Sequence, residues 1–144
     1  MQAYPHKYQV TSEGAAQGNV ELTSPGLQSL TTAPPPQFGG PEGIWSPETL
    51  FAASVADCYI LSFRAVTQMK KFDWIAIRCE TDAILDKPER LPMFTRLDLR
   101  VTLTVAAGTD KAEAEKLLQR AKDICLVTNS MTAEKTLTTE IVEA

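Results

Sequence analysis

One long segment of the sequence is apolar on almost every side of a helix, and this feature constrains the fold most. Residues 46–72 read SPETLFAASVADCYILSFRAVTQMKKF. Between Leu50 and Met69, only Asp57 and Arg64 are charged. A helix that is apolar nearly all round has to be buried. The segment therefore predicts a long buried helix at the centre of the fold.

The start of this helix is marked by three residues. Ser46 suits the N-cap, and Pro47 suits the first helical position. Glu48 follows in the first turn, where the helix dipole favours a negative charge. Stabilising the helix N-terminus is enough to explain Glu48 without a catalytic role. The alternative is that Glu48 orients a nearby cation in a functional site.

The segments on either side of the helix alternate between β-prone runs and turns. Residues 7–13 and 19–24 flank the sequence GAAQG and predict a hairpin. Residues 31–45 carry four prolines and three glycines and predict a long loop. Residues 73–85 and 94–105 both alternate apolar and polar side chains, so they predict a second antiparallel hairpin with one face on the core.

Charge predicts how the second hairpin pairs. Opposite residues in an antiparallel pair have residue numbers with a constant sum, and opposite charges favour facing each other. A sum of about 176 places Arg78 opposite Asp98 and Glu80 opposite Arg96. A sum of about 178 would instead place Arg78 opposite Arg100. We therefore expect the first register.

The last part of the chain predicts one more helix and one more strand. Asp110 and Glu113 resemble a capping box at the start of a helix over residues 110–125. Residues 136–144 read as a closing strand. The order of hairpin, buried helix, hairpin, amphipathic helix and strand indicates an α+β fold, which we expect to form a single domain over residues 1–144.

The composition excludes several classes of protein. With 18 acidic and 14 basic residues the net charge is −4, which argues against a nucleic-acid-binding protein. No apolar run approaches a membrane span, and the N-terminal sequence has no signal-peptide core. We therefore expect a cytoplasmic protein whose cysteines are reduced. The single histidine, His6, lies far in sequence from every cysteine, so no zinc site and no cofactor is expected.

The three cysteines allow two interpretations. Cys79 lies on the apolar face of its predicted strand and is expected to be a buried core residue, distant from the other two. Cys58 lies inside the central helix, and Cys125 ends the apolar stripe of the last helix. Both face the core, so they are either two ordinary core residues or one reactive pair.

Asp57 and the aromatic residues near the helix also leave alternatives open. An acid among apolar neighbours has to be paired, protonated or exposed. The simplest of these alternatives is an ion pair between Asp57 and Arg64 through an intervening or partner side chain. Phe38, Trp45 and Tyr59 either line a lipophilic pocket or belong to the core.

Two motifs resemble the OsmC/Ohr family of thiol-dependent peroxidases. The segment SPETLFAASVADCYI is similar to the family run N-P-E-x-L-x-A-A that leads to a helical cysteine, here Cys58. The segment CLVTNSM is similar to the family's C-P-V-S-N-like segment, which the second cysteine, here Cys125, opens. The resemblance extends over nearly the whole chain, in the same order of elements.

The resemblance implies a fold and an activity. The family fold is an intertwined homodimer, in which antiparallel strands from both chains form six-stranded sheets around two central helices. The implied roles are Cys58 as the peroxidatic nucleophile and Cys125 as the resolving thiol, in the reduction of organic hydroperoxides. The implied reductant is a dithiol such as dihydrolipoamide, or another thiol. Glu48 matches the family glutamate that orients an activating arginine.

The sequence departs from the family pattern in two places. No lysine, arginine or histidine occurs between Lys7 and Phe63, where the family supplies its arginine, and Leu126 replaces the usual proline. These two departures lead to a second hypothesis. In it, the chain is a family member without appreciable peroxidase activity that binds an apolar ligand or senses redox state.

Overall fold

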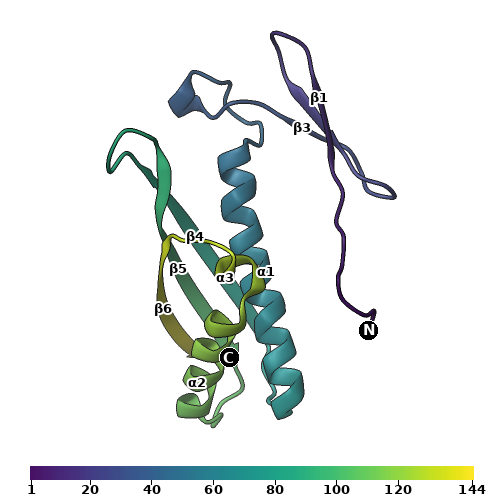
Figure 1. The fold of residues 1–144 in the computed structure, drawn as a ribbon. Helices are drawn as coiled ribbons and strands as arrows, with labels where there is room; N and C mark the ends of the chain where they lie inside the picture. The colour runs from purple at the N-terminus through teal and green to yellow at the C-terminus, as the bar shows by residue number, and fades with distance from the viewer. The chain divides into compact units, whose positions relative to one another are not determined.

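The computed structural model describes all 144 residues. They form two compact units, Met1–Leu50 and Phe51–Ala144, whose helices and strands are drawn in Figure 1. The α+β class expected from the sequence is confirmed, since each unit carries a small sheet and one long helix runs through the middle of the chain. The single-domain organisation stays a prediction.

The first unit contains a three-stranded antiparallel sheet in the order β1-β2-β3 (Figure 1). Its strands are β1 (Thr11–Gly14), β2 (Val20–Thr23) and β3 (Leu30–Thr32). The expected first hairpin is confirmed as β1 and β2, which pair across the GAAQG turn. The third strand was not predicted, because three residues leave too short a pattern to recognise.

A proline-rich loop follows β3 and folds back on itself. It contains a short 3₁₀ helix over Pro36–Phe38. The N–H of Gly40 donates to the carbonyl of Pro35 at 3.1 Å. A side chain at Gly40 would collide with the carbonyl group of Pro34, so only glycine allows this close approach.

Helix α1 (Pro47–Lys70) begins where the sequence predicts. The N–H of Thr49 donates to the Ser46 side-chain oxygen at 3.1 Å, and the N–H of Ser46 donates to the Thr49 hydroxyl at 2.8 Å. This reciprocal cap satisfies helix donors that would otherwise be unpaired. The helix ends before Lys71, whose φ of 53° is left-handed.

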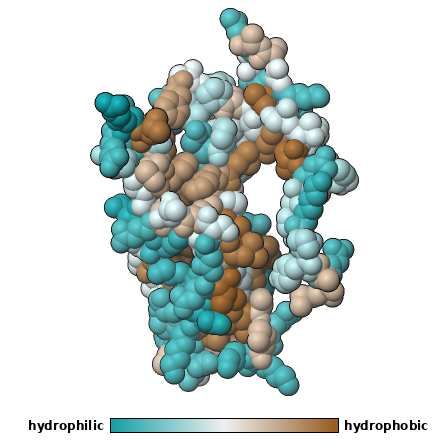
Figure 2. Space-filling view, in the orientation of Figure 1, coloured by the Kyte–Doolittle hydropathy of each residue, from teal (hydrophilic) through white to brown (hydrophobic).

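Only one face of α1 is buried within the chain, so a single chain covers only part of the helix that the sequence predicts to be buried. The opposite face carries apolar side chains in the open: Leu61 is 50% exposed and Met69 is 84% exposed. Figure 2 shows apolar surface along the line of α1. The buried side chains form one stripe at helical spacing: Val55, Tyr59, Phe63, Val66 and Thr67.

By length and composition α1 could also cross a membrane, contrary to the expectation that no segment approaches a span. The core helix of a soluble protein meets the same criterion. Here Val55, Tyr59 and Phe63 belong to the same hydrophobic cluster as residues of the second sheet. We therefore regard α1 as a core helix.

The second unit contains the sheet β4-β5-β6. Its strands are β4 (Ala76–Asp86), β5 (Met93–Val105) and β6 (Glu134–Glu143). The predicted antiparallel pairing of β4 with β5 is confirmed. Strand β6 runs parallel to β5, so the sheet is mixed and not wholly antiparallel as expected. Helix α2 lies between β5 and β6 in the chain and supplies the connection that a parallel pair needs.

The predicted register of the second hairpin is wrong. Glu80 lies opposite Arg100 and Asp82 lies opposite Asp98, so paired residue numbers add to 180 and not to 176. The register shifts between Ile84 and Leu85. At this irregularity one strand has an extra residue that no residue of the other strand opposes. Matching opposite charges across the hairpin cannot predict such an extra residue.

Arginines beside the facing acids compensate for their like charge. Arg100 donates to Asp82 at 2.7 Å and also lies 3.6 Å from Glu80. Arg96 donates to Asp98 at 2.8 Å. The ion pairs of this hairpin thus run directly across the two strands, diagonally or along one strand, and together they tolerate the Asp82–Asp98 opposition.

Helix α2 (Lys111–Ile124) and the short helix α3 (Leu126–Asn129) complete the second unit. The N–H of Glu113 donates to the Asp110 side chain at 3.0 Å, which confirms the predicted N-cap. The predicted apolar stripe is confirmed as well. Its buried members are Ala114, Leu117, Leu118, Ala121 and Cys125.

Candidate active site

Cys58 lies at the middle of α1, next to the buried stripe. Its side chain is half-buried, and its sulfur lies 4.0 Å from the Ser62 hydroxyl oxygen. Burial raises the pKa of the Cys58 thiol, and the neighbouring Cys125 raises it further, whereas the backbone N–H of Val127 lowers it. None of the strongest influences on this pKa comes from a cationic side chain.

Cys125 lies at the junction of α2 and α3. It caps the end of one helix and the start of the other, and it is only 1% exposed. Burial acts to raise the pKa of Cys125, but the side chain and N–H of Thr128, together with the Cys58 thiol, bring it below the ordinary value. The chain turn at α3 thus stabilises a thiolate at Cys125.

The structure brings Cys58 and Cys125 together, although both are free thiols. Each thiol shifts the pKa of the other: Cys125 raises the pKa of Cys58, and Cys58 lowers the pKa of Cys125. The negative charge of the pair therefore rests on Cys125. Cys58 is the more exposed of the two, so a reagent from solvent meets Cys58 first.

Cys79 differs from the expectation of a buried, distant core residue. It is half-buried on β4, with its sulfur 3.5 Å from the Thr81 hydroxyl oxygen. Burial raises the pKa of the Cys79 thiol, and a negative charge on Cys125 raises it further. Cys79 thus lies within electrostatic range of Cys125, because β4 and α2 face the same core.

Glu48 lies in the first unit, in the first turn of α1, and is half-buried. Its Oε2 atom is shielded from solvent and has no hydrogen-bond partner. No ion pair joins it to any basic side chain of the chain. The glutamate that matches the family pattern is therefore present, and no basic side chain of the same chain forms an ion pair with it.

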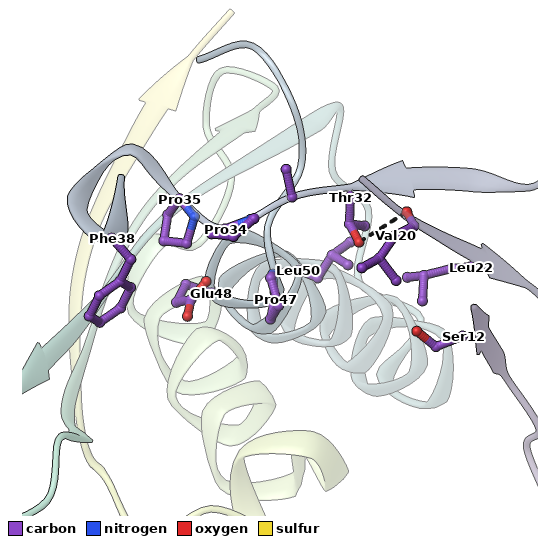
Figure 3. Close-up of a pocket in the computed structure, with 11 residues that line it drawn as sticks. Ser12, Val20, Leu22, Thr32, Pro34, Pro35, Phe38, Pro47, Glu48 and Leu50 are labelled. Atoms are coloured by element: carbon purple, nitrogen blue, oxygen red, sulfur yellow. Dashed lines mark hydrogen bonds between the residues drawn. The ribbon is translucent and has the colours of Figure 1, made fainter. Parts of the chain in front are cut away.

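The remaining candidates have ordinary positions. Asp57 and Arg64 are both exposed and form no ion pair with each other, so exposure is the alternative that holds for Asp57. Tyr59 is a core residue with no exposed surface. Phe38 lines one cavity of the first unit (Figure 3), and Trp45 lines another.

One part of the site was missed at the level of sequence. The backbone N–H groups of Val127 and Thr128 act on the two thiols, because α3 turns directly after Cys125. A four-residue helix has no periodic pattern that a sequence reading can recognise.

Comparisons with known proteins identify the family and the fold of this chain. Residues 40–140 match the profile of the OsmC-like protein family. A search of curated proteins found no match.

Solved structures share the fold. An OsmC-like protein of unknown function from Vibrio cholerae superposes with a TM-score of 0.84 at 17% identity, over 96% of this chain and 100% of that one. An organic hydroperoxide resistance protein from Elizabethkingia anophelis gives 0.79 at 18% identity, over 99% and 100%.

A third structure is more similar in sequence. It is an organic hydroperoxide resistance protein OsmC from Legionella pneumophila, also described as a predicted redox protein, with a TM-score of 0.76 at 25% identity over 96% of this chain and 98% of that one. The family profile covers well over half of the sequence, and each superposition covers at least 96% of it. The chain therefore belongs to the OsmC-like protein family.

Proposed function

We propose that the protein is a thiol-dependent peroxidase that reduces organic hydroperoxides through a Cys58–Cys125 disulfide cycle. One observation carries this proposal: the half-exposed Cys58 thiol lies near enough to the buried Cys125 thiol for each to shift the pKa of the other. Redox proteins and hydroperoxide resistance proteins among the structural relatives support the same class of function.

The first step is attack of the Cys58 thiolate on the distal oxygen of the hydroperoxide. The O–O bond breaks, the alcohol ROH leaves after taking a proton, and Cys58 becomes a sulfenic acid. Cys125 accepts the proton of the Cys58 thiol as attack begins and passes it to the departing alkoxide, so Cys125 is again a thiolate for the second step. Apolar side chains on α1 next to Cys58, such as Leu61, favour an organic hydroperoxide over hydrogen peroxide.

The second step joins the two cysteines. The Cys125 thiolate attacks the Cys58 sulfur, the S–O bond breaks, and the hydroxide leaves as water after taking a proton. An external dithiol then restores both thiols by two thiol–disulfide exchanges and is itself oxidised to a disulfide. We propose a dithiol of the dihydrolipoamide type, a cytoplasmic location and a homodimer as the working form.

A second candidate function is favoured by the environment of Cys58. Its thiol pKa is raised, and no cationic side chain is among its main influences, whereas an efficient peroxidatic cysteine needs its thiolate at neutral pH. A protein that binds an apolar ligand or senses redox state by slow oxidation of the same pair would tolerate this environment.

Turnover separates the two functions. The reduced protein is mixed with tert-butyl or cumene hydroperoxide and a dithiol, and alcohol formation is followed in the wild type and in Cys58→Ser, Cys125→Ser and Cys79→Ser. We expect Cys58→Ser to be inactive, Cys125→Ser to complete at most one turnover with the dithiol omitted, and Cys79→Ser to retain activity. Absence of turnover by the wild type with several hydroperoxides and reductants would exclude the peroxidase.

A further inference from the structure

One hydroxyl group beside Cys58 has no role in the two steps described above. Ser62 lies four residues after Cys58 on α1, and residues at this spacing share one face of a helix. Its hydroxyl oxygen lies 4.0 Å from the Cys58 sulfur, and the Ser62 side chain is half-buried. Because both residues belong to one helix, the backbone of α1 alone sets their relative positions.

Ser62 differs from Ser54 and Thr67 on the same helix. The Ser54 hydroxyl donates to the carbonyl oxygen three residues before it at 2.7 Å, and the Thr67 hydroxyl donates to the carbonyl oxygen four residues before it at 2.9 Å. Such bonds to the preceding turn are common inside helices. The Ser62 hydroxyl forms no bond of this kind, and its one hydrogen-bonding contact is the Cys58 sulfur. Its proton is therefore available to a group on that sulfur.

The contact does too little for the reduced thiol to explain the position of Ser62. At 4.0 Å it is long, and hydrogen bonds weaken with distance. Burial raises the pKa of the Cys58 thiol, and Ser62 lowers it by too little to reverse this effect. Ser62 therefore does not supply the activation that the first step needs.

The same distance suits the product of the first step. Oxidation adds one oxygen atom to the Cys58 sulfur. One S–O bond followed by an O–H···O hydrogen bond of about 2.8 Å, bent at the shared oxygen, spans about 4 Å. A sulfenic oxygen that points along α1 toward Ser62 thus lies at hydrogen-bond distance from its hydroxyl group.

A hydrogen bond to this oxygen acts on the second step. As the Cys125 thiolate attacks the Cys58 sulfur, the S–S bond forms, the S–O bond breaks, and the electron pair of the S–O bond goes to the departing oxygen. A donor aimed at an atom where negative charge develops lowers the barrier, because it binds the transition state more strongly than the ground state. The hydroxide then takes a proton from solvent and leaves as water.

We propose that the Ser62 hydroxyl donates a hydrogen bond to the sulfenic oxygen on Cys58 and so speeds formation of the Cys58–Cys125 disulfide. The inference rests on the proposed peroxidase function, and it adds a catalytic residue to the second step of that reaction. The first step does not depend on Ser62.

Single-turnover kinetics without a reductant separate the two steps. Reduced full-length protein is mixed with cumene hydroperoxide or hydrogen peroxide, at concentrations high enough that disulfide formation limits the rate. Sulfenic acid and disulfide are quantified by mass spectrometry after rapid quenching. We expect Ser62→Ala to form the sulfenic acid as fast as the wild type, and to convert it to the disulfide about three- to tenfold more slowly.

Two further variants separate the hydroxyl group from its surroundings. Ser62→Ala itself places a strong helix former in α1, so folding is retained. Ser62→Thr keeps a hydroxyl group and should return most of the lost rate of disulfide formation, which a change in packing would not do. Ser54→Ala is the matched control, because the Ser54 hydroxyl bonds only to the backbone of the same helix, and it should leave both steps unchanged.

The outcomes distinguish this inference from the peroxidase function. Turnover by the wild type, with disulfide formation equally fast in Ser62→Ala, would overturn the role of Ser62 and leave the peroxidase standing. Slowing of the first step alone would also overturn it, since Ser62 would then act on the thiolate. A wild type that forms no sulfenic acid at Cys58 with any hydroperoxide would overturn both proposals.

Discussion

The hydroxyl group of Tyr59 on α1 donates a hydrogen bond of 2.9 Å to the carbonyl oxygen of Leu118 on α2, and both side chains are fully buried. The bond links the helix of Cys58 to the helix that ends at Cys125. Because these two helices carry the candidate pair, the Tyr59–Leu118 contact helps to hold together the elements on which the two thiols lie.

Tyr59→Phe should lower the free energy of unfolding by about 0.5–1.5 kcal/mol, because it removes this buried hydrogen bond and changes little else. Urea unfolding measures the loss. The control is Tyr8→Phe, since Tyr8 is exposed, and its effect should be close to zero. A Tyr59→Phe variant as stable as the wild type would show that the bond contributes nothing.

The same tyrosine predicts a pH dependence. Burial raises the pKa of the Tyr59 hydroxyl above its ordinary value of 10.0, so the unfolded chain loses this proton before the folded chain does. The contribution of Tyr59 is complete below pH 10.0 and is lost as the pH rises further. The stability difference between the wild type and Tyr59→Phe should therefore shrink above that pH, and urea unfolding across that range checks it.

Alkylation should reveal how the two thiols share charge. Because Cys125 raises the pKa of Cys58, Cys125→Ser should shift the midpoint of Cys58 alkylation by iodoacetamide to lower pH. Mass spectrometry of the Cys58 peptide measures the rate at each pH. Cys79→Ser should leave the midpoint unchanged, and an upward shift in Cys125→Ser would contradict the arrangement.

The exposed apolar face of α1 predicts self-association. Leu61 and Met69 are open in the single chain, and a second copy packed on this face would bury them. We expect a dimer in light scattering at micromolar concentration, and mostly monomer for Leu61→Glu. Leu91→Glu changes a leucine that is 77% exposed outside α1 and should remain dimeric. A wild-type monomer would contradict the prediction.

Arg100 should matter to the second hairpin because of the facing aspartates. Arg100→Gln leaves Asp82 opposite Asp98 without the ion pair to Asp82, so the melting temperature should fall, most strongly at low salt. Arg96 and then Thr136 hold the pKa of Asp98 below its usual value. Its stabilising charge is therefore present at neutral pH and lost as the pH falls through that lowered pKa.

The difference between Arg100→Gln and the wild type should narrow both at high salt and in acid. Arg120→Gln is the control, since Arg120 is exposed on α2 and forms no ion pair. A salt-independent loss in Arg100→Gln would indicate packing by the arginine stem and not charge.

The sequence predicts those features that local patterns determine. The cap at Ser46, the cap at Asp110 and the alternation along β4 and β5 each follow from residues close in the chain, and each is confirmed. The family motifs likewise predict the neighbouring positions of Cys58 and Cys125 in the second unit.

Other features depend on the balance between competing interactions, and the sequence alone does not show which interaction is stronger. The hairpin register was wrong because exposed ion pairs are weak, so they do not fix a register against core packing and a strand irregularity. The parallel pairing of β6 needs knowledge of where α2 lies. The missing partner of Glu48 became visible only once its Oε2 atom proved to be buried.

The parallel pairing of β5 and β6 also governs the order in which the second sheet is completed during synthesis. Strand β5 is the central strand, yet its second neighbour is formed by Glu134–Glu143, which follows both α2 and α3. While the ribosome makes the intervening residues, one edge of β5 has no partner. Such an edge can pair with strands of other chains. A nascent chain can therefore associate wrongly through β5 until β6 emerges and covers this edge.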